Sequence, residues 1–499
     1  MFVALLSRAL GRLSTPALLR LGAILGWVWY RVIPLRRREA REAVARAFPE
    51  LSSAAREQIV AQNFKHLVQA LLETVAFLAW DDARLARTVH FEGLHDAVTG
   101  ALSRGHGSLV LSAHLGSFEL SMGSYGVFSK FPIVIVARVP KAGYARDMLE
   151  AVRAKTGIEV LPPKRSLPRL IKRLSEDRVV LGFVVDQNMP RKQGVFVEFL
   201  GKWCCTTPGF SIIARRSGAE IIPGYNQRLP DGTHLGRFGP AVAPDPHPHK
   251  RVAVLNDTWN MTLQTEAWIR RAPEQWFWVH RRWKVQPLPG DVVRTRRGLE
   301  IARAGGVSNG RIGALLDRDG TINMEIGRAL QAPEEVRLVP GAAEAIRRLN
   351  GAGIPVVVVS NQAGIGRGTI TVPTLDSIHA RMRELLAAEG ASIDAIYYCP
   401  HHPTEAKGEF LKDCDCRKPK PGLPLRAAAE HGLDLQASLF VGDRSADVAA
   451  ARAAGMRGVA VTNGWAHEPW QPVEADEVCA DLIVAVDGFL DRTFGGSAA

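Results

Sequence analysis

The sequence contains only six cysteines among 499 residues, and four of them (Cys399, Cys414, Cys416 and Cys479) lie in the second half. A secreted protein that depends on disulfides would carry an even set of cysteines spread along a short chain. The scarcity and clustering of the thiols therefore favour a reducing compartment, and we expect a cytoplasmic protein.

The N-terminal segment lacks an apolar run long enough to cross a bilayer. Within residues 1–33 arginines interrupt the apolar residues, and the longest clean run, 21–30, is shorter than the roughly 20 residues that a span needs. No small-residue cleavage site of a signal peptide is recognised after it. The run ends in aromatic residues and Arg36–Arg38 follow, which is typical of an interfacial anchor. We predict a membrane-anchoring helix over 1–38; the alternative is a buried amphipathic helix.

Charge is divided unevenly along the chain. Residues 1–300 carry 43 Lys and Arg against 25 Asp and Glu, a net charge of +18, whereas the remaining residues carry 20 against 25, a net charge of −5. A basic half suits nucleic acid, anionic lipid or an acidic carrier protein. Because no arginine- and aromatic-rich nucleic-acid module is recognisable, we expect an anionic membrane surface or an acidic protein as partner, and no nucleic acid.

A chain of this length is expected to form two or three domains. We predict an anchor over 1–38, a domain over 39–288, a linker over 289–310 and a second domain over 311–499. The linker contains Pro, Gly and Ser residues that favour flexibility, with a short helix predicted over 298–304. Both domains are predicted to be α/β. In the second, strands at 312–316, 354–359, 395–398, 438–442 and 459–461 alternate with helices at 341–350, 373–389, 422–431 and 445–454, which predicts a parallel sheet covered on both faces.

Three apolar runs in the second half each end in polar residues that suit catalysis. The runs and the residues that follow them are 314–316 with Asp317 and Asp319, 356–359 with Ser360, and 439–442 with Asp443. Such runs predict buried strands, whose carboxyl ends form the edge where open α/β sheets bind ligands. Two carboxylates there repel each other unless a cation or proton lies between them. They suit a nucleophilic carboxylate, a Mg²⁺ ion and a neighbouring general acid. A lone Asp-x-Asp pair would more often be solvated.

These strand ends, in this order and with the cation of Lys418, resemble the haloacid dehalogenase phosphatase superfamily. The resemblance implies a Rossmann-like parallel sheet. It also implies that Asp317 attacks phosphorus, while Asp319 protonates the leaving oxygen and then activates water. Mg²⁺ would be held by Asp317, by Asp443 and by Asp319 through its backbone carbonyl. A catalytically inactive scaffold is disfavoured, because these acids and the lysine are all present.

A second cluster of ligating residues lies between the strands predicted at 395–398 and 438–442. Cys399-Pro400-His401 precedes Cys414-Asp415-Cys416, and three thiolates with one imidazole form a tetrahedral Zn²⁺ set. No open coordination position remains, so the metal would be structural and would order the intervening loop. His402 in place of His401, free thiols, or a disulfide between Cys414 and Cys416 are the alternatives.

Together with this cluster, the motifs over about 311–470 resemble D-glycero-D-manno-heptose 1,7-bisphosphate 7-phosphatases and also the related histidinol phosphate phosphatases. A segment at 325–328 falls where that family contacts its substrate, and it lacks the Tyr that many heptose enzymes carry after the Gly. A guanidinium at 417 suits a second phosphate, which favours a heptose bisphosphate over histidinol phosphate. The substrate-binding residues that the resemblance implies are Glu325, Gly327, Arg328, Ser360, Asn361, Gln362, Arg417 and Lys418.

The first half contains a possible base and its carboxylate partner. Apolar runs at 108–111, 133–136 and 179–185 predict strands, and the first leads into His114 and Glu119, spaced as H-x₄-E. If a helix begins after Gly116, Glu119 can fold back toward the imidazole, fix its tautomer and leave the other nitrogen as a base for a hydroxyl. A lone His-Glu pair at this spacing is more often structural.

Other motifs accompany that pair. They are Ala47 to Leu51, Asp186-Gln187, Val195 to Val197, Thr206-Thr207 and His280 to Lys284. Together these resemble lipid A biosynthesis acyltransferases over about 1–287. The resemblance implies that His114 is the base, that Glu119 orients it and that Arg138 binds an acidic headgroup.

It also implies acyl carrier protein as donor, a glycolipid as acceptor and a site on the cytoplasmic face of the inner membrane. The sequence therefore favours a bifunctional enzyme of lipopolysaccharide assembly. The alternative is a phosphatase, for histidinol phosphate or another small phosphomonoester, tethered by an inactive acyltransferase-like half.

Overall fold

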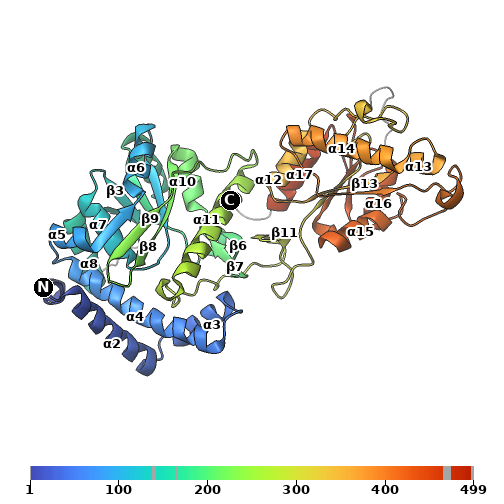
Figure 1. Cartoon of the computed structure of the whole chain (residues 1–499). Coiled ribbons are helices and arrows are strands. Elements are labelled where there is room, and N and C mark those ends of the chain that lie inside the picture. Colours follow the sequence, from blue (N-terminus) through green and yellow to red (C-terminus); the bar gives the residue numbers. More distant parts are fainter. Residues whose placement is uncertain (1, 138–141, 164–165, 465–473, 496–499) are drawn as a thin grey trace. The chain divides into compact units, whose positions relative to one another are not determined.

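The structure, a computed structural model, describes residues 2–137, 142–163, 166–464 and 474–495. The chain divides into two compact units, drawn from blue to green and from yellow to red in Figure 1. The first unit consists of Met1–Asp245 and Val254–Gln286, and the second of Pro246–Ala253 and Pro287–Ala499. Each unit has its own α/β core, as the sequence predicts.

The first unit opens with helices that pack on one long helix. They are α1 (Phe2–Gly11), α2 (Thr15–Val32), α3 (Arg37–Ala47), α4 (Ser53–Phe77) and α5 (Asp82–Thr88). Helix α2 lies against α4, and two glycines permit the contact. A Cβ at Gly26 would lie 2.5 Å from the Cα of Lys65, and one at Gly22 would lie 2.8 Å from the Cα of Gln69. Any side chain at either position would push the two helices apart.

Helix α2 turns one stripe toward α4 and leaves apolar side chains exposed elsewhere. Its buried stripe consists of Leu18, Gly22, Gly26 and Tyr30. Ile24 is 61% exposed, Trp27 51% and Val32 68%. Among the described residues, no single helix is both long and apolar enough to span a membrane; α2 and α3 pass by length and composition only as a pair, with a bend of 95° between them.

A seven-stranded sheet forms the core of the first unit, in the order β1-β9-β8-β2-β5-β3-β4. Its strands are β1 (Val89–Glu92), β2 (Ser108–Ser112), β3 (Ile133–Val136), β4 (Glu159–Leu161), β5 (Val180–Val184), β8 (Glu220–Arg228) and β9 (His234–Phe238). Strands β8, β2, β5, β3 and β4 are parallel, whereas β9 runs antiparallel to β8. The strands predicted over 108–111, 133–136 and 179–185 are confirmed as β2, β3 and β5. Because β2 and β5 are neighbours, the residues that follow them meet at one edge.

The other elements of this unit cover the sheet and close its functional edge. They are α6 (Leu94–Ser103), α7 (Phe118–Phe128), α8 (Tyr144–Thr156), α9 (Leu167–Glu176), α10 (Gly209–Ser217), the hairpin of β6 (Val195–Phe199) and β7 (Lys202–Thr206), and α11 (Lys250–Arg271), whose first residues belong to the second unit. After α11 the chain returns to the end of β2, where Trp276 pairs with Leu115. We call residues 276–285 the closing segment.

The second unit is built on a six-stranded parallel sheet in the order β14-β13-β12-β15-β16-β17. The strands are β12 (Ala314–Leu316), β13 (Val356–Asn361), β14 (Ala395–Cys399), β15 (Leu439–Gly442), β16 (Arg457–Val461) and β17 (Glu477–Cys479). The helices are α12 (Ala342–Gly351), α13 (Ala363–Arg367), α14 (Val372–Ala388), α15 (Gly422–His431), α16 (Ser445–Ala453) and α17 (Leu482–Gly495). The predicted alternation of strands and helices is confirmed.

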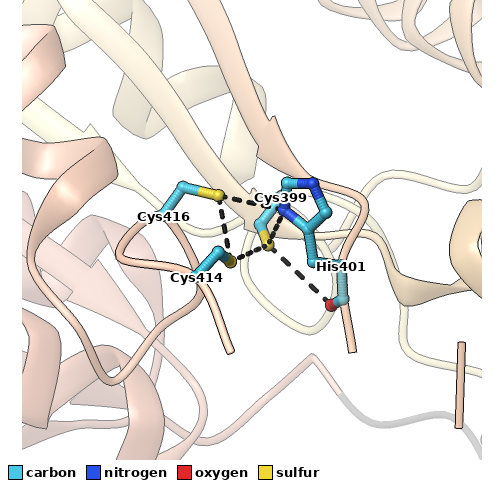
Figure 2. Close-up of side chains that lie close together, drawn as sticks. All are labelled: Cys399, His401, Cys414 and Cys416. Atoms are coloured by element: carbon cyan, nitrogen blue, oxygen red, sulfur yellow. Dashed lines mark hydrogen bonds between the residues drawn. The ribbon is translucent and has the colours of Figure 1, made fainter. Parts of the chain in front are cut away.

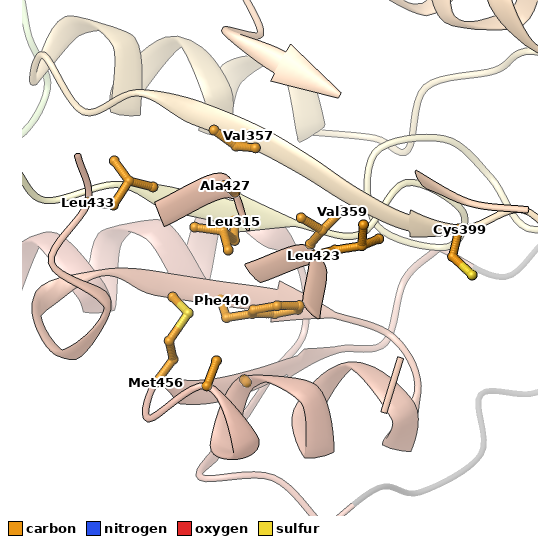
Figure 3. Close-up of a cluster of buried hydrophobic side chains, with 11 residues drawn as sticks. Leu315, Val357, Val359, Cys399, Leu423, Ala427, Leu433, Phe440 and Met456 are labelled. Atoms are coloured by element: carbon orange, nitrogen blue, oxygen red, sulfur yellow. The ribbon is translucent and has the colours of Figure 1, made fainter. Parts of the chain in front are cut away.

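Apolar side chains cover both faces of this sheet. On one face Leu315, Val357 and Phe440 pack against residues of α15 and α16 (Figure 3). Successive side chains of a strand point to opposite faces, and Leu316 and Val358, which point the other way, are also completely buried. A sheet buried on both faces holds its carboxyl edge rigidly, which suits a catalytic site.

The predicted linker contains a folded hairpin. Strands β10 (Val292–Thr295) and β11 (Gly298–Ile301) pair antiparallel around a two-residue turn, so the helix predicted over 298–304 is wrong. Gly298 has a φ of +133°, which a helix does not accept, and the Glu300 carboxylate is fully buried against Thr295 Oγ1 and Arg297 Nε. The Ile312 backbone N–H donates to Leu299 O, which fastens the hairpin to the second unit.

Candidate active sites

The carboxyl ends of three adjacent strands bring the predicted phosphatase residues together. Asp317 follows β12, Ser360 lies near the end of β13 and Asp443 follows β15. Because the sheet order places β12 between the other two strands, these side chains converge at one edge. All three are buried, Asp443 to 1% exposure.

Lys418 is the cation at the centre of this site. Its Nζ lies 2.6 Å from Asp317 Oδ1 and 2.5 Å from Asp447 Oδ1, and it donates to Val359 O at 2.8 Å. Three acceptors satisfy all three N–H groups of the ammonium. Asn361 fixes the lysine backbone, because its amide donates to Lys418 O and accepts from Lys418 N, each at 3.0 Å.

The negative charges of the carboxylates outnumber the single positive charge of Lys418. Ligand oxygens of Asp317, Asp443 and Asp447 all lie within 4.8 Å of one another. Burial raises the pKa of Asp317 to about 7 despite Lys418, with Asp447 and Asp319 adding to the rise. Burial and the charges of Asp317 and Asp447 raise the pKa of Asp443 to about 9. A buried set of hard oxygen ligands with excess negative charge fits a divalent cation such as Mg²⁺.

Gly320 is needed for this clustering. Its φ is +78°, and a Cβ there would lie 2.2 Å from Asp443 Oδ2. Both the backbone conformation and the space exclude a side chain. The turn that follows Asp319 can therefore approach the acid on β15 only because this residue is glycine.

Asp319 faces a different set of partners. It accepts hydrogen bonds from Arg318 Nη2 at 2.7 Å, Asn323 Nδ2 at 2.9 Å and Gln362 Nε2 at 2.9 Å. Burial works to raise the pKa of Asp319, but the charge and hydrogen bonds of Arg318, with the two amides, hold that pKa below its usual value. The Asp319 side chain thus lies beside the cluster of carboxylates rather than within it. Asp447, to which the sequence assigned no role, is the third member of that cluster.

The predicted substrate-binding residues differ in burial: some lie in the buried floor of the site and others nearer the surface. Ser360 Oγ accepts from Gln362 Nε2 at 2.8 Å in the buried floor of the site. Glu325 accepts from Gly327 N at 2.8 Å and from Arg444 Nη2 at 2.7 Å. Arg328 instead forms an exposed ion pair with Glu335, with Nη2 and Oε1 2.7 Å apart.

Arg417 connects the site to the cysteine cluster. Its Nη1 donates to the backbone carbonyl of His401 at 3.1 Å. The backbone N–H of the next residue, Lys418, is held by Asn361. The dipeptide thus places one cation inside the site and the other toward the cluster.

The four predicted zinc ligands lie together (Figure 2). Sγ of Cys399 lies 3.4 Å from Sγ of Cys414, which lies 3.2 Å from Sγ of Cys416, and His401 Nδ1 lies 3.3 Å from Cys416 Sγ. These separations are close to the edges of a tetrahedron with Zn–S bonds of about 2.3 Å. The residues therefore fit a zinc ion.

Two of the alternatives for this cluster, the disulfide and His402 in place of His401, receive no support. A disulfide between Cys414 and Cys416 would require sulfurs about 2.05 Å apart, and both thiols are free. His402 lies outside the cluster, where its Nδ1 accepts from the Glu405 backbone N–H at 3.0 Å. Burial raises the pKa of the Cys399 thiol, which a metal ion would reverse by binding the thiolate.

In the first unit, His114 is held by a carboxylate that the H-x₄-E spacing did not identify. His114 Nδ1 lies 2.7 Å from Asp186 Oδ1, and the His114 backbone N–H donates to Asp186 Oδ2 at 2.8 Å. Trp276 Nε1 also donates to Asp186 Oδ2, at 2.7 Å. Burial works to raise the pKa of Asp186, but His114 and these donors lower it to about 2. Asp186 is therefore an acceptor, and His114 Nδ1 carries the proton.

Glu119, which the resemblance implies orients the ring, is not the hydrogen-bond partner of His114 Nδ1, because Asp186 holds that atom. Glu119 lies buried in the first turn of α7, and burial raises its pKa to about 7. Within the described part of the chain it makes no hydrogen bond to the imidazole. The reason is topological: β5 is the neighbour of β2, so the acid that follows β5 reaches His114 directly. Burial would lower the pKa of His114, but Asp186 and the more distant charge of Glu119 raise it.

The closing segment holds the strand end that carries Asp186. Arg282, 1% exposed, donates from Nη1 to Gln187 O at 3.1 Å and to Cys205 O at 2.7 Å. His280 Nε2 accepts from the Asn188 backbone N–H at 2.9 Å. These contacts explain why motifs far apart in the sequence occur together. Arg138, the predicted headgroup ligand, lies outside the described residues.

The structure was compared with known proteins. A family model described as bacterial lipid A biosynthesis acyltransferase matches residues 1–285, and a HAD-hydrolase-like model matches 415–485. The D-glycero-beta-D-manno-heptose-1,7-bisphosphate 7-phosphatase of Pseudomonas putida is 45% identical over 151 residues, which cover 30% of this chain and 82% of that protein. The D-glycero-D-manno-heptose-1,7-bisphosphate 7-phosphatase of Chlorobaculum tepidum is 39% identical over 183 residues, covering 35% and 92%.

A crystal structure of D,D-heptose 1,7-bisphosphate phosphatase from B. bronchiseptica, complexed with magnesium and phosphate, is 34% identical and covers 36% of this chain and 99% of that chain, with a TM-score of 0.32. The acyltransferase model spans more than half of the chain, and the second unit matches most of each phosphatase relative. The chain therefore belongs to the bacterial lipid A biosynthesis acyltransferases through its first unit and to the D-glycero-D-manno-heptose 1,7-bisphosphate 7-phosphatases through its second, and it is a phosphatase fused to an acyltransferase-family domain.

Proposed function

We propose that the protein is a bifunctional enzyme of lipopolysaccharide assembly. The second unit hydrolyses the 7-phosphate of D-glycero-D-manno-heptose 1,7-bisphosphate, and the first transfers an acyl chain from acyl carrier protein to a lipid A-type glycolipid. The observation that carries the phosphatase activity is the buried cluster of Asp317, Asp443 and Asp447, two of which pair with Lys418, in a unit that over 151 residues is 45% identical to a heptose bisphosphatase.

Phosphate transfer begins at Asp317. Its carboxylate attacks phosphorus, the bond from phosphorus to the sugar oxygen breaks, and that oxygen takes a proton from Asp319. A water molecule then attacks the aspartyl-phosphate, Asp319 takes its proton, and free phosphate leaves with Asp317 restored. Asp317, Asp443 and the Asp319 carbonyl would hold Mg²⁺, whose charge would offset that of the phosphoryl oxygens. The donors around Asp319 favour its ionised form, which is the form that accepts a proton from water. The first step needs the protonated form, so Asp319 must take up a proton when the negative charge of the phosphate arrives beside it.

Lys418 prepares the attacking group. Its ammonium, 2.6 Å from Asp317 Oδ1, fixes one carboxylate oxygen and leaves the other for phosphorus. Ser360 Oγ accepts from Gln362, so its own O–H can donate to a phosphoryl oxygen. Lys418 can hold a phosphoryl oxygen only by exchanging one of its three present acceptors for it. Asp447 opposite keeps the lysine charged and in place, because a buried ammonium without an anion would lose its proton.

The cations near the site favour a substrate with two phosphates. Arg417 presents a planar guanidinium that can form paired hydrogen bonds with a second phosphate. Histidinol phosphate has no second phosphate, and its ammonium would be repelled by an arginine. Arg328 adds to this preference only if it leaves Glu335. The relatives that bear the heptose bisphosphatase name support the same choice.

The test is kcat/KM measured side by side on the heptose bisphosphate and on histidinol phosphate, with Arg417→Ala as the variant. We expect the wild type to prefer the bisphosphate, and the variant to lose mainly that preference, by about 10- to 100-fold. Arg426→Ala, which removes an exposed arginine paired with Glu430, is the matched control. A wild-type preference for histidinol phosphate would overturn the substrate but not the aspartyl-phosphate mechanism.

Acyl transfer uses the dyad of the first unit. Asp186 holds the Nδ1–H of His114, so the lone pair of the ring lies on Nε2, the nitrogen that takes the proton of an acceptor hydroxyl. The oxygen attacks the thioester carbonyl carbon, the carbon–sulfur bond breaks, and the thiolate receives the proton from His114. An acidic acyl carrier protein suits the net charge of +18 over residues 1–300.

Membrane association completes the proposal. The exposed apolar side chains of α2 and the arginines that follow support attachment to an anionic surface at the cytoplasmic face of the inner membrane. Sedimentation with vesicles of phosphatidylglycerol and phosphatidylethanolamine tests this. We expect binding that high salt weakens but does not abolish, because it combines charge and apolar burial. Trp27→Ser should weaken it further, and a full-length protein that stays in the supernatant at low salt would contradict the proposal.

A further inference from the structure

The base nitrogen of His114 is covered in this structure. Gln187 places its side-chain Nε2 3.0 Å from His114 Nε2. Since Asp186 holds the proton on Nδ1, the neutral ring offers a lone pair at Nε2, and the amide N–H donates to it. The nitrogen that must accept the proton of the acyl acceptor is therefore engaged by a side chain of the protein itself.

Gln187 lies at the open side of the imidazole. The His114 side chain is only 12% exposed, with the rings of Phe118 and Phe277 at centroid distances of 4.5 and 6.1 Å, whereas Gln187 is exposed. Any hydroxyl that approaches Nε2 from solvent meets the amide first. A flexible exposed side chain can leave this position without disturbing the fold.

The backbone on either side of this amide is fixed. Arg282 donates to Gln187 O, and the next residue, Asn188, donates its N–H to His280 and accepts from the Val285 N–H at 3.0 Å. Only the side chain of Gln187 is left to move. The closing segment thus presents the amide to His114 and limits its freedom, which lowers the entropy cost of the contact.

We propose that Gln187 caps the base nitrogen in the free site and yields it to the acyl acceptor, so that the enzyme selects a glycolipid hydroxyl over water. This rests on the proposed role of His114 as the base. A glycolipid brings binding energy from contacts remote from its hydroxyl, and that energy compensates for breaking the Gln187–His114 bond. A single water molecule has no such contacts.

The reaction that the cap suppresses is hydrolysis of the acyl donor. In it, His114 Nε2 takes a proton from water, the hydroxide oxygen attacks the thioester carbon, and the carbon–sulfur bond breaks. The thiolate then receives the proton from His114, giving a fatty acid and a free thiol. The step needs no other reactant, so a cap on Nε2 is the protection that the site itself can supply. Gln187 acts through His114 and is a positioning residue.

The test compares full-length wild type, Gln187→Ala and the matched control Gln193→Ala in detergent. Gln193 is an exposed glutamine six positions along, in the short helix at 191–193. The probe is acyl carrier protein loaded with a fatty acyl thioester, without acceptor, and the readout is free thiol. We expect hydrolysis to rise about three- to ten-fold in Gln187→Ala, the range for loss of one hydrogen bond, and to stay unchanged in Gln193→Ala. Far-UV circular dichroism and the thermal unfolding of the first unit, compared with those of the wild type, show whether each variant is folded.

Two further variants separate the role of the cap from that of the base. One is the single variant His114→Ala, and the other is the double variant that combines His114→Ala with Gln187→Ala. If both hydrolyse equally slowly, the additional hydrolysis passes through His114 and the proposal is supported. If His114→Ala is slow but Gln187→Ala matches Gln193→Ala, the cap is wrong and the base role stands. If the double variant hydrolyses the donor as fast as Gln187→Ala, the additional hydrolysis does not pass through His114, and both the cap and the base role are wrong.

A second measurement needs no acyl chemistry. Diethyl pyrocarbonate modifies the unprotonated imidazole, and mass spectrometry of the peptide that contains His114 gives its rate. We expect faster modification in Gln187→Ala than in Gln193→Ala, because the lone pair is uncovered. Equal rates would overturn the cap.

Discussion

The two active sites bury charge in opposite ways. In the phosphatase unit, three carboxylates surround one ammonium, and the pKa values of Asp317 and Asp443 rise to about 7 and 9. In the acyltransferase unit one carboxylate, Asp186, faces one imidazole, and its pKa falls to about 2. The first arrangement requires an added cation to ionise fully, whereas the second is balanced by the chain itself. Chemistry at the two sites should therefore respond differently to the same perturbations.

The largest difference should follow loss of the phosphatase nucleophile. Asp317→Asn keeps the size of the side chain but removes the attacking anion, so we expect phosphatase kcat to fall by about 10³-fold or more. Acyl transfer should not change. Chelation of Mg²⁺ should give the same pattern in the wild type, since it leaves the excess charge unneutralised. Steady-state assays of both activities test this, and near-normal hydrolysis by the variant would contradict the mechanism.

The converse change is His114→Ala. It removes the base, so acyl transfer should fall by about 10²- to 10⁴-fold, while phosphatase kcat/KM stays within experimental error. His95→Ala, at a histidine on α6 that faces Phe131, is a matched control that should affect neither activity. Persistent transfer in His114→Ala would show that the dyad is structural only.

A smaller effect, confined to the second unit, is expected for its zinc cluster. Cys416→Ser removes one of four ligands, so the bound zinc, about one per chain in the wild type, should fall. The unit should lose about 3 kcal/mol of stability, equivalent to roughly 6–12 °C in Tm for a domain of this size. Cys479→Ser, outside the cluster, is the control. Wild-type protein purified without chelator and found free of zinc by elemental analysis would refute the assignment.

The smallest expected effect is a shift in pH dependence. The groups that face His114 are Asp186, Glu119 and His280, and Asp186 stays ionised throughout because its pKa is about 2. Asp186→Asn removes the charge that raises the pKa of His114, so that pKa should fall. Because the base must be neutral, the acid limb of acyl transfer should move to lower pH by about one unit.

Profiles of kcat/KM against pH for the variant and the wild type would measure this shift. Glu119→Gln, which leaves the Nδ1 partner in place, should move the limb less. A larger shift in Glu119→Gln than in Asp186→Asn would show that Glu119, the acid suggested by the H-x₄-E spacing, is the main partner of His114.

The same contrast explains what could be predicted from the sequence. Asp317, Ser360, Lys418 and Asp443 follow strands or short motifs whose local pattern is clear, and parallel strands necessarily bring their ends to one edge. The clustering of Cys399, His401, Cys414 and Cys416 was equally evident, because a C-x-H and a C-x-C pair are only a short loop apart. Local sequence and sheet geometry together sufficed for these residues but not for Asp447, which completes the acid cluster.

The acyltransferase dyad could not be predicted in the same way. Asp186 is 72 positions from His114, and only the pairing of β2 with β5 brings them together. Glu119 was nearer in sequence and gave the more obvious pattern. The acid directly after a third parallel strand was the signal that could have indicated Asp186. Likewise, nothing local distinguishes the buried Glu300 that makes the predicted linker fold as a hairpin.

The close approach of α2 to α4 has a mechanical consequence. Gly26 brings the backbone of α2 against Lys65 and Phe64 of α4, and the adjacent Asn63 donates from Nδ2 to the backbone carbonyls of Glu274 and Trp276. Trp276 in turn holds Asp186. The helix with the exposed apolar face is thus separated by a few rigid contacts from the carboxylate that holds His114. A tilt of α2 would press directly on the backbone of α4 at Gly26, where no side chain separates the two helices. It would then reach His114 through Asn63, Trp276 and Asp186.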